Sequence, residues 1–151
     1  MRLFVKAGRN AIVPSSAVFD ASTVVRWLID DPLTPTAIEA GRTFSAIAPM
    51  LLGSELANAM RGQVKAGLYE AEWCVIQMRR LPQLIVLKDE RELWPQALRL
   101  AVERDHAAYD CVYVAMAITL ALPLITADTK LARKFADVPG LEVKLLQDWT
   151  A

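Results

Sequence analysis

Residues 109–128 read YDCVYVAMAITLALPLITAD, and this stretch decides the fold class. From Tyr109 onward the apolar residues follow the i, i+3, i+4, i+7 spacing of a buried helix, which places Asp110 in the first turn. Residues 124–126 then predict a short buried strand, and Asp128 comes just after it. A buried helix that leads into a buried strand is typical of an α/β protein with a parallel sheet.

The same alternation extends in both directions along the chain. It predicts a three-layer α/β/α domain over residues 16–151 with a central, mostly parallel sheet, preceded by a loosely ordered leader at 1–15. Pro32 and Pro35 are expected to stop the first helix, Pro49 suits the first turn of the third, and Pro82 is expected to end the fourth. The expected strands are 16–19, 46–48, 84–87 (the clearest buried strand), 124–126 and an edge strand at 142–146; the expected helices are 23–29 (capped by Ser22), 36–43, 49–66, 69–81, 91–104, 109–120 and 129–135.

Composition narrows the class of protein. The 151 residues are 54% hydrophobic and carry no net charge, so we expect one well-packed domain that contacts nucleic acid only through a local basic patch. Cys74 and Cys111 lack metal-site spacing and are expected to be reduced thiols in the cytoplasm. The single histidine, His106, excludes a multi-histidine zinc site. The longest apolar stretch, 111–125, is short for a membrane span.

Four carboxylates are expected to meet at one edge of the sheet. Asp20 and Asp128 each follow a strand, while Glu55 and Asp110 lie early in helices. Ligands in open α/β sheets bind beyond the carboxyl ends of the strands, so these side chains would converge there. Such a cluster needs a cation to neutralise it, and a purely oxygen ligand set suits Mg²⁺, with Mn²⁺ as a substitute.

The natural chemistry of that arrangement is phosphodiester hydrolysis by metal-activated water, with no protein nucleophile. Each acid taken singly also has an ordinary explanation. Glu55 could be a solvated helix residue, Asp110 a first-turn charge favoured by the helix dipole, and Asp128 a helix cap. The combination of all four favours the functional interpretation.

The chain resembles the PIN-domain family at four motifs in order: VFDAS at 18–22, SEL at 54–56, YDCVYVAMA at 109–117 and LITAD at 124–128. The resemblance spans roughly residues 16–146, and the last two motifs are the more specific. It implies a metal-dependent endoribonuclease, best matched by VapC-type toxins that are paired with an antitoxin protein. It also implies that Asp20, Glu55, Asp110 and Asp128 bind the metal, supported by the hydroxyls of Ser22 and Thr126. One departure is that the first acid stands as late as position 20.

Other residues give weaker hypotheses. Arg61 and Lys65 on one helix, and Lys130, Arg133 and Lys134 after Asp128, either contact RNA phosphates or line solvated helix faces. His106 has no partner that the sequence identifies, so a loop or capping role is expected. The high apolar content predicts a homodimer, with Leu51, Leu52, Trp73 and Met78 as exposed candidates. The four tryptophans are expected to be core or interface anchors.

Two other functions stay open at this point. A phosphatase or related phosphoryl-transfer enzyme also places an aspartate after its first strand, although Ser22 stands where a second aspartate would be expected. A non-catalytic interaction module with a vestigial site is the other alternative, and the presence of all four acids disfavours it.

Overall fold

The computed structural model describes residues 14–150, which form a five-stranded, entirely parallel sheet in the order β3-β2-β1-β4-β5. The predicted α/β/α fold class is therefore confirmed; of the expected leader, residues 1–13 lie outside the described residues. Strands and helices alternate along the chain as β1 (Ser16–Phe19), α1 (Ala21–Leu28), α2 (Thr34–Thr43), β2 (Ser45–Pro49), α3 (Leu52–Lys65), α4 (Ala71–Leu84), β3 (Val86–Lys88), α5 (Trp94–Arg104), α6 (Ala108–Leu120), β4 (Leu124–Thr126), α7 (Thr129–Phe135) and β5 (Val143–Leu145).

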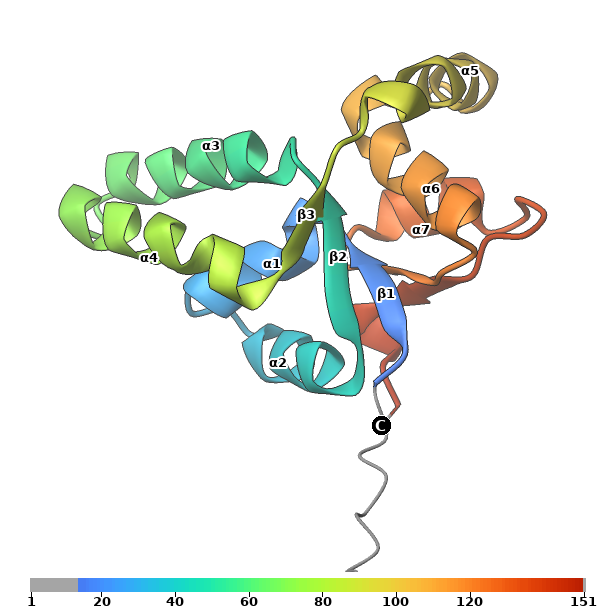
Figure 1. Ribbon diagram of the computed structural model, residues 1–151. Coiled ribbons are helices and arrows are strands. Elements are labelled where there is room, and N and C mark those ends of the chain that lie inside the picture. Colours follow the sequence, from blue (N-terminus) through green and yellow to red (C-terminus); the bar gives the residue numbers. More distant parts are fainter. Residues whose placement is uncertain (1–13, 151) are drawn as a thin grey trace, which may run out of the picture.

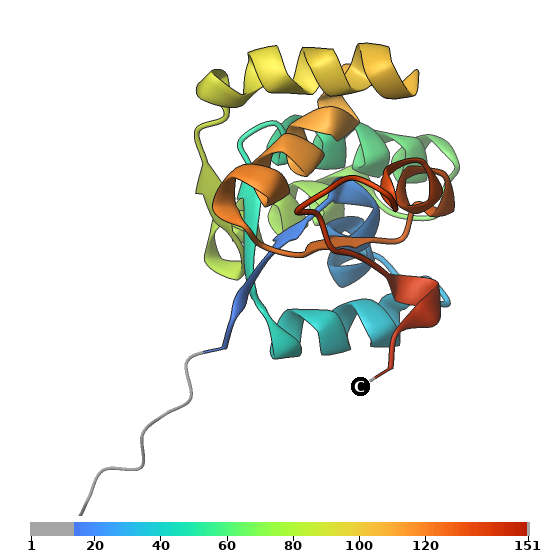
Figure 2. The same cartoon turned by 90° about the vertical axis from the view of Figure 1, so that its right-hand side faces the viewer.

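Helices cover both faces of the sheet (Figure 1). α1 to α4 lie on one side, where α3 and α4 run side by side and extend away from the strands. α6 and α7 cover the other side, and α5 lies across the outer surface of α6 (Figure 2). Residues 111–117 of α6 are all buried, because this helix packs against strands on one side and against α5 on the other.

The strand order reverses next to β1. The chain adds β2 and then β3 on one side of β1, and it crosses back through α5 and α6 to place β4 on the other side. Phe19 at the end of β1 lies opposite Ile125 of β4. In an open α/β sheet, ligands usually bind in the crevice at the carboxyl ends of two such strands. The residues after Phe19 and after Thr126 are therefore the ones expected to contact a ligand.

Prolines account for the misplaced element boundaries. α4 continues through Pro82 to Leu84, and β3 is an edge strand whose Val86 is exposed, so the expected buried strand at 84–87 was wrong. Pro49 ends β2 instead of opening the next helix, at a strand end where its missing N–H costs little. Pro35 stops nothing, because it stands in the first turn of α2, where a proline is well tolerated.

Apolar exposure differs from the expected set. Leu52 is fully buried in the core, which corrects its assignment as an exposed residue, and Leu51 and Met78 are partly buried against the core. Trp73 is exposed and stacks on Tyr69 with ring centroids 4.6 Å apart. Trp27 and Trp149 pack against the core as expected. Among the described residues, no helix combines the length and apolar character that crossing a membrane requires.

Candidate metal centre

Asp20 is a buried carboxylate held by three neighbouring donors. Its Oδ1 accepts hydrogen bonds from the Ser22 hydroxyl at 2.7 Å and from the backbone N–H of Thr23 at 3.1 Å. Its Oδ2 accepts from the Thr126 hydroxyl at 2.5 Å. The bond from Thr23 makes Asp20 the N-cap of α1, which corrects the expectation that Ser22 caps this helix.

The same two hydroxyls tie Asp20 to the segment after β4. The backbone N–H of Ala127 donates to Ser22 Oγ at 2.9 Å, and the N–H of Asp128 donates to Thr126 Oγ1 at 3.0 Å. Each hydroxyl thus donates to Asp20 and accepts from the loop that carries Asp128. Ser22 and Thr126 therefore fix the relative position of the two strand-end aspartates.

Glu55 lies in the first turn of α3 and receives a hydrogen bond from α6. The Tyr113 hydroxyl donates to Glu55 Oε2, and Tyr113 itself is buried. Burial raises the pKa of Glu55 to about 7, the bond from Tyr113 opposes that rise, and the charges of Asp110 and Asp20 add to it. The two aspartates therefore lie near enough to Glu55 for their charges to act on it.

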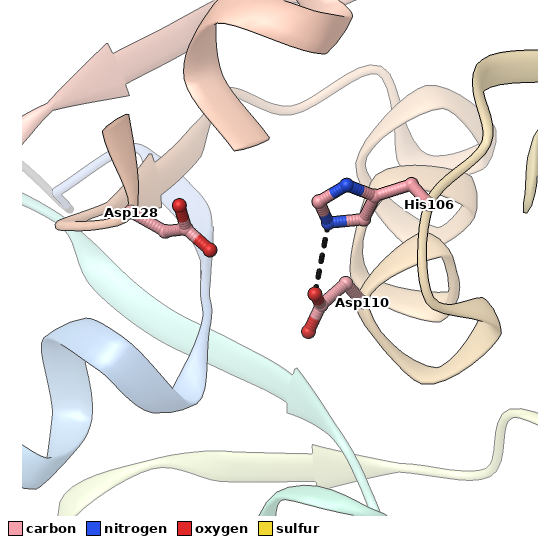
Figure 3. Close-up of side chains that lie close together, drawn as sticks. All are labelled: His106, Asp110 and Asp128. Atoms are coloured by element: carbon pink, nitrogen blue, oxygen red, sulfur yellow. Dashed lines mark hydrogen bonds and ion pairs between the residues drawn. The ribbon is translucent and has the colours of Figure 1, made fainter. Parts of the chain in front are cut away.

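His106, Asp110 and Asp128 form the other side of the site (Figure 3). Nε2 of His106 lies 2.9 Å from Asp110 Oδ2, and one ligand atom from each of the three residues lies within 4.8 Å of the others. Asp110 lies in the first turn of α6, while Asp128 is the N-cap of α7 and accepts hydrogen bonds from the backbone N–H groups of Lys130 and Leu131. The ordinary explanation of Asp128 as a cap is thus correct, and within residues 14–150 its second oxygen accepts no hydrogen bond.

The four carboxylates, here called the acidic cluster, influence one another's ionisation. Burial raises the pKa of Asp20 to about 6, although its hydrogen bonds to Thr126 and Ser22 oppose this. Burial also raises the pKa of Asp110, with His106 lowering it and the charge of Asp128 raising it. The charges of Asp20 and Asp110 thus act on Glu55, and the charge of Asp128 acts on Asp110. Among the described residues, the group whose ligand atoms lie within 4.8 Å of one another is His106, Asp110 and Asp128, and it does not include Asp20 or Glu55.

This donor set fits a hard divalent cation. It offers several carboxylate oxygens at a partly buried position, and within residues 14–150 no lysine or arginine side chain bonds to any of the four acids. Asp20, Glu55, Asp110 and Asp128 are the residues that would hold such an ion. The hydroxyls of Ser22, Thr126 and Tyr113 and the ring of His106 would orient them.

Two contributors to the site were missed by sequence reasoning. Tyr113 stands three positions after Asp110, and His106 stands four positions before it, so both share a helical neighbourhood with that acid. This spacing was the available signal for His106, whose partner, Asp110, the sequence analysis had not identified. Tyr113 could not have been connected to Glu55 without the packing of α3 near α6.

The basic residues lie in two different surroundings. Arg61 and Lys65 are exposed on α3, about 9 and 15 Å along the helix axis beyond Glu55. Lys130, Arg133 and Lys134 lie on α7, directly after Asp128, and Lys134 donates to the backbone oxygen of Asp105. The α7 group is therefore the nearer along the chain to a strand-end acid, and RNA contact by either group stays a prediction.

Cys111 lies next to Asp110 and is fully buried. Burial and the charge of Asp110 raise the pKa of its thiol to about 11, so the sulfur is protonated at neutral pH. Cys74 is also buried, and both cysteines are free. The expectation of inert, reduced thiols agrees with this placement.

Comparisons with known proteins place the chain. The PIN domain family matches residues 17–136. Ribonuclease VapC1 of Mycobacterium tuberculosis is 35% identical over 152 aligned positions, which cover 91% of this chain and 98% of that protein. A toxin-antitoxin complex from Klebsiella pneumoniae has the same fold, with a TM-score of 0.61 and 18% identity over 83% of this chain and 95% of that one. FitAcB from Neisseria gonorrhoeae also has a TM-score of 0.61 and 18% identity, over 88% and 99%. The chain belongs to the PIN-domain family, as its motifs predicted.

Proposed function

We propose that this protein is a metal-dependent endoribonuclease and the toxin of a toxin–antitoxin pair. The observation that carries the proposal is the grouping of His106, Asp110 and Asp128, whose ligand atoms lie within 4.8 Å of one another, next to Asp20, which Ser22 and Thr126 tie to the segment that carries Asp128. Glu55 and Asp20 are proposed to complete the site. The name of its relative, ribonuclease VapC1, supports RNA as the substrate. The free thiols of Cys74 and Cys111 support action in the reducing cytoplasm.

The proposed mechanism is hydrolysis of an RNA phosphodiester bond by water. A bound Mg²⁺ or Mn²⁺ would lower the pKa of a coordinated water and stabilise the charge that builds up on the phosphate. Asp20 and Glu55 would be among the residues that hold the cation, and the hydrogen bonds that Thr126 and Tyr113 donate to them restrict the positions of their carboxylates. Asp128 would contribute the oxygen that does not cap α7. No side chain is required as a nucleophile.

The test is RNA degradation by purified protein. We expect cleavage in Mg²⁺ or Mn²⁺, loss of cleavage in excess chelator, and loss in Asp110→Asn, because that change removes one charged ligand. Asp30→Asn is the matched control, since Asp30 is exposed and follows the far end of α1 from Asp20. Cleavage that persists in chelator, or equal loss in both variants, would contradict the proposal.

The proposed antitoxin has a suitable surface on α3 and α4. A hollow of about 700 Å³ between these helices is lined by Met60, Val64, Val75 and Met78, and Arg61, Lys65 and Arg79 border it. A partner segment with an apolar face flanked by acidic side chains fits this chemistry. Val75→Glu should therefore weaken binding of a partner encoded beside this gene without changing RNA cleavage by the isolated protein.

The proposed homodimer would use a different surface. One face of α5 carries an exposed apolar side chain every four residues: Trp94, Leu98 and Val102, which are 55%, 60% and 75% exposed. A continuous exposed apolar surface of this kind is typical of a protein–protein contact. Sedimentation should show a dimer that dissociates on Leu98→Glu. A monomer across a wide concentration range would contradict this part of the proposal.

A further inference from the structure

We propose that His106 is itself a metal ligand, binding a divalent cation together with Asp110 and Asp128, and that its nitrogen shifts this position away from Mg²⁺ toward transition-metal ions. The proposal rests on the metal-dependent function proposed above. It extends that function, because an all-carboxylate site has no reason to prefer a nitrogen-binding ion.

The geometry of the three side chains suits a single ion. Nε2 of His106 and Oδ2 of Asp110 are 2.9 Å apart, and the set that includes an Asp128 oxygen spans at most 4.8 Å. Adjacent ligands of an octahedral ion with bonds of about 2.1 Å lie about 3 Å apart, and opposite ligands lie about 4.2 Å apart. An ion can therefore enter this position with only small side-chain movements.

The imidazole ring is already fixed in place before any ion arrives. Its side chain is only 5% exposed, and the ring packs edge-on against Phe135 with centroids 5.5 Å apart. The backbone N–H of His106 donates to the carbonyl of Ala101 at 3.1 Å. α5 ends at Asp105 in the left-handed conformation, with φ of 48°, which turns the chain so that His106 precedes α6. Such a preset ring loses little conformational entropy when it binds an ion.

The chemistry of the pair distinguishes a ligand from a mere hydrogen-bond donor. In the absence of an ion, one hydrogen lies between Nε2 and Asp110. Coordination instead uses the Nε2 lone pair, so the ring hydrogen moves to Nδ1 and the cation takes the place of the shared hydrogen. An imidazole nitrogen favours ions such as Co²⁺ and Ni²⁺ over Mg²⁺, which prefers oxygen.

One spectroscopic measurement decides whether His106 is a ligand. The chain contains a single histidine, so in tag-free protein any strong coupling between bound Mn²⁺ and an imidazole nitrogen must come from His106. Pulsed electron paramagnetic resonance on the Mn²⁺-loaded wild type should show this coupling, and His106→Gln should remove it. Bound Mn²⁺ without imidazole coupling in the wild type would overturn the proposal, even if the variant failed to fold.

Metal affinity gives a second, independent readout. By calorimetry, His106→Gln should weaken Co²⁺ binding by about tenfold or more while weakening Mg²⁺ binding less. Equal losses for both ions would mean that His106 only orients Asp110, and would overturn the proposal. If RNA cleavage in Mg²⁺ survives that outcome, the proposed nuclease function stands; if no cation binds and no RNA is cleaved, both fail.

Discussion

The two sides of the acidic cluster are held in different ways. Asp20 is buried, and its carboxylate accepts three hydrogen bonds from groups on α1 and β4. Asp110 and Asp128, on the other side, are partly exposed, and their bonds go to His106 and to the first turn of α7. The first arrangement is built into the sheet, whereas the second depends on residues at helix starts.

This difference suggests that the two sides of the acidic cluster have different roles. A carboxylate that is desolvated and held by three hydrogen bonds resists movement, so we expect Asp20 to be the less mobile part of the proposed site. A carboxylate that is 29% exposed, as Asp110 is, can exchange its partners for an ion, a water or a phosphate. The following variants test whether the buried residues around Asp20 determine the geometry of the proposed site more strongly than the partly exposed residues do.

Asp20→Asn should have the largest effect. The amide removes a charge from the cation position and places an NH₂ group among three donors, so RNA cleavage should fall by more than about a hundredfold. A cleavage assay at matched protein concentration, with circular dichroism as the check of folding, measures this. Activity close to wild type would show that Asp20 is a helix cap and nothing more.

Thr126→Val should come next, because it separates support from ligation. The change leaves Asp20 Oδ2 without one donor and the N–H of Asp128 without its acceptor, at a fully buried position. We expect cleavage to fall by roughly tenfold to a hundredfold, and the free energy of unfolding to fall by about 1–3 kcal/mol. Thr126→Ser keeps the hydroxyl and should stay near wild type; similar losses in both variants would point to packing rather than to the hydrogen bonds.

Glu55→Gln should raise stability when no metal is present. Folding raises the pKa of Glu55 from 4.5 to about 7, so the wild type loses stability as the pH rises through this range and Glu55 ionises in the folded state. The glutamine variant lacks that loss. In chelator at pH 8 its free energy of unfolding should exceed that of the wild type by about 1–2 kcal/mol, after allowing for solvent screening of this partly exposed group.

Urea titrations at several pH values check the Glu55 result. The advantage of the variant should disappear near pH 4.5, where Glu55 is largely protonated in the wild type as well. If the variant is more stable than the wild type by the same free energy at every pH, ionisation of Glu55 does not destabilise the folded state. That result would contradict the inferred charge interactions within the acidic cluster.

Tyr113→Phe should have the smallest effect of the four. The ring keeps its packing in α6, and only the hydrogen bond to Glu55 is lost. We expect a change of about 1 kcal/mol in the free energy of unfolding and a fall in cleavage rate of only a fewfold. A loss of cleavage activity as large as that of Asp20→Asn would indicate that the Tyr113 hydroxyl takes part in the reaction and does not only support Glu55.

Much of this comparison could be predicted from the sequence. The alternation of apolar strands and amphipathic helices indicated the parallel sheet, and the aspartates after Phe19 and Thr126 indicated its functional edge. These signals are local, because the end of a strand and the start of a helix can each be recognised from a few consecutive residues. Thr126 as a supporting hydroxyl followed from the same motif.

The remainder depends on packing between distant segments. Leu84 and Ile85 appeared to begin a strand because they are apolar, yet Leu84 completes a helix that tolerates Pro82 near its end. Tyr113 contacts Glu55 across 58 positions, which no local spacing reveals. His106 was expected to have a loop or capping role because the sequence identified no partner for it, although its distance of four residues from Asp110 placed the two side chains within reach.

The chemistry of the cleaved RNA ends tests the central claim most directly. If the acidic cluster activates water, fragments made in Mn²⁺ and ¹⁸O-labelled water should carry a linear terminal monophosphate with one solvent oxygen, as mass spectrometry would measure. The opposite fragment should carry an unmodified hydroxyl, and no 2′,3′-cyclic phosphate should form at any time. Fragments that end in a cyclic phosphate would show that the neighbouring ribose hydroxyl is the nucleophile, and metal-activated water would be excluded as the agent of cleavage.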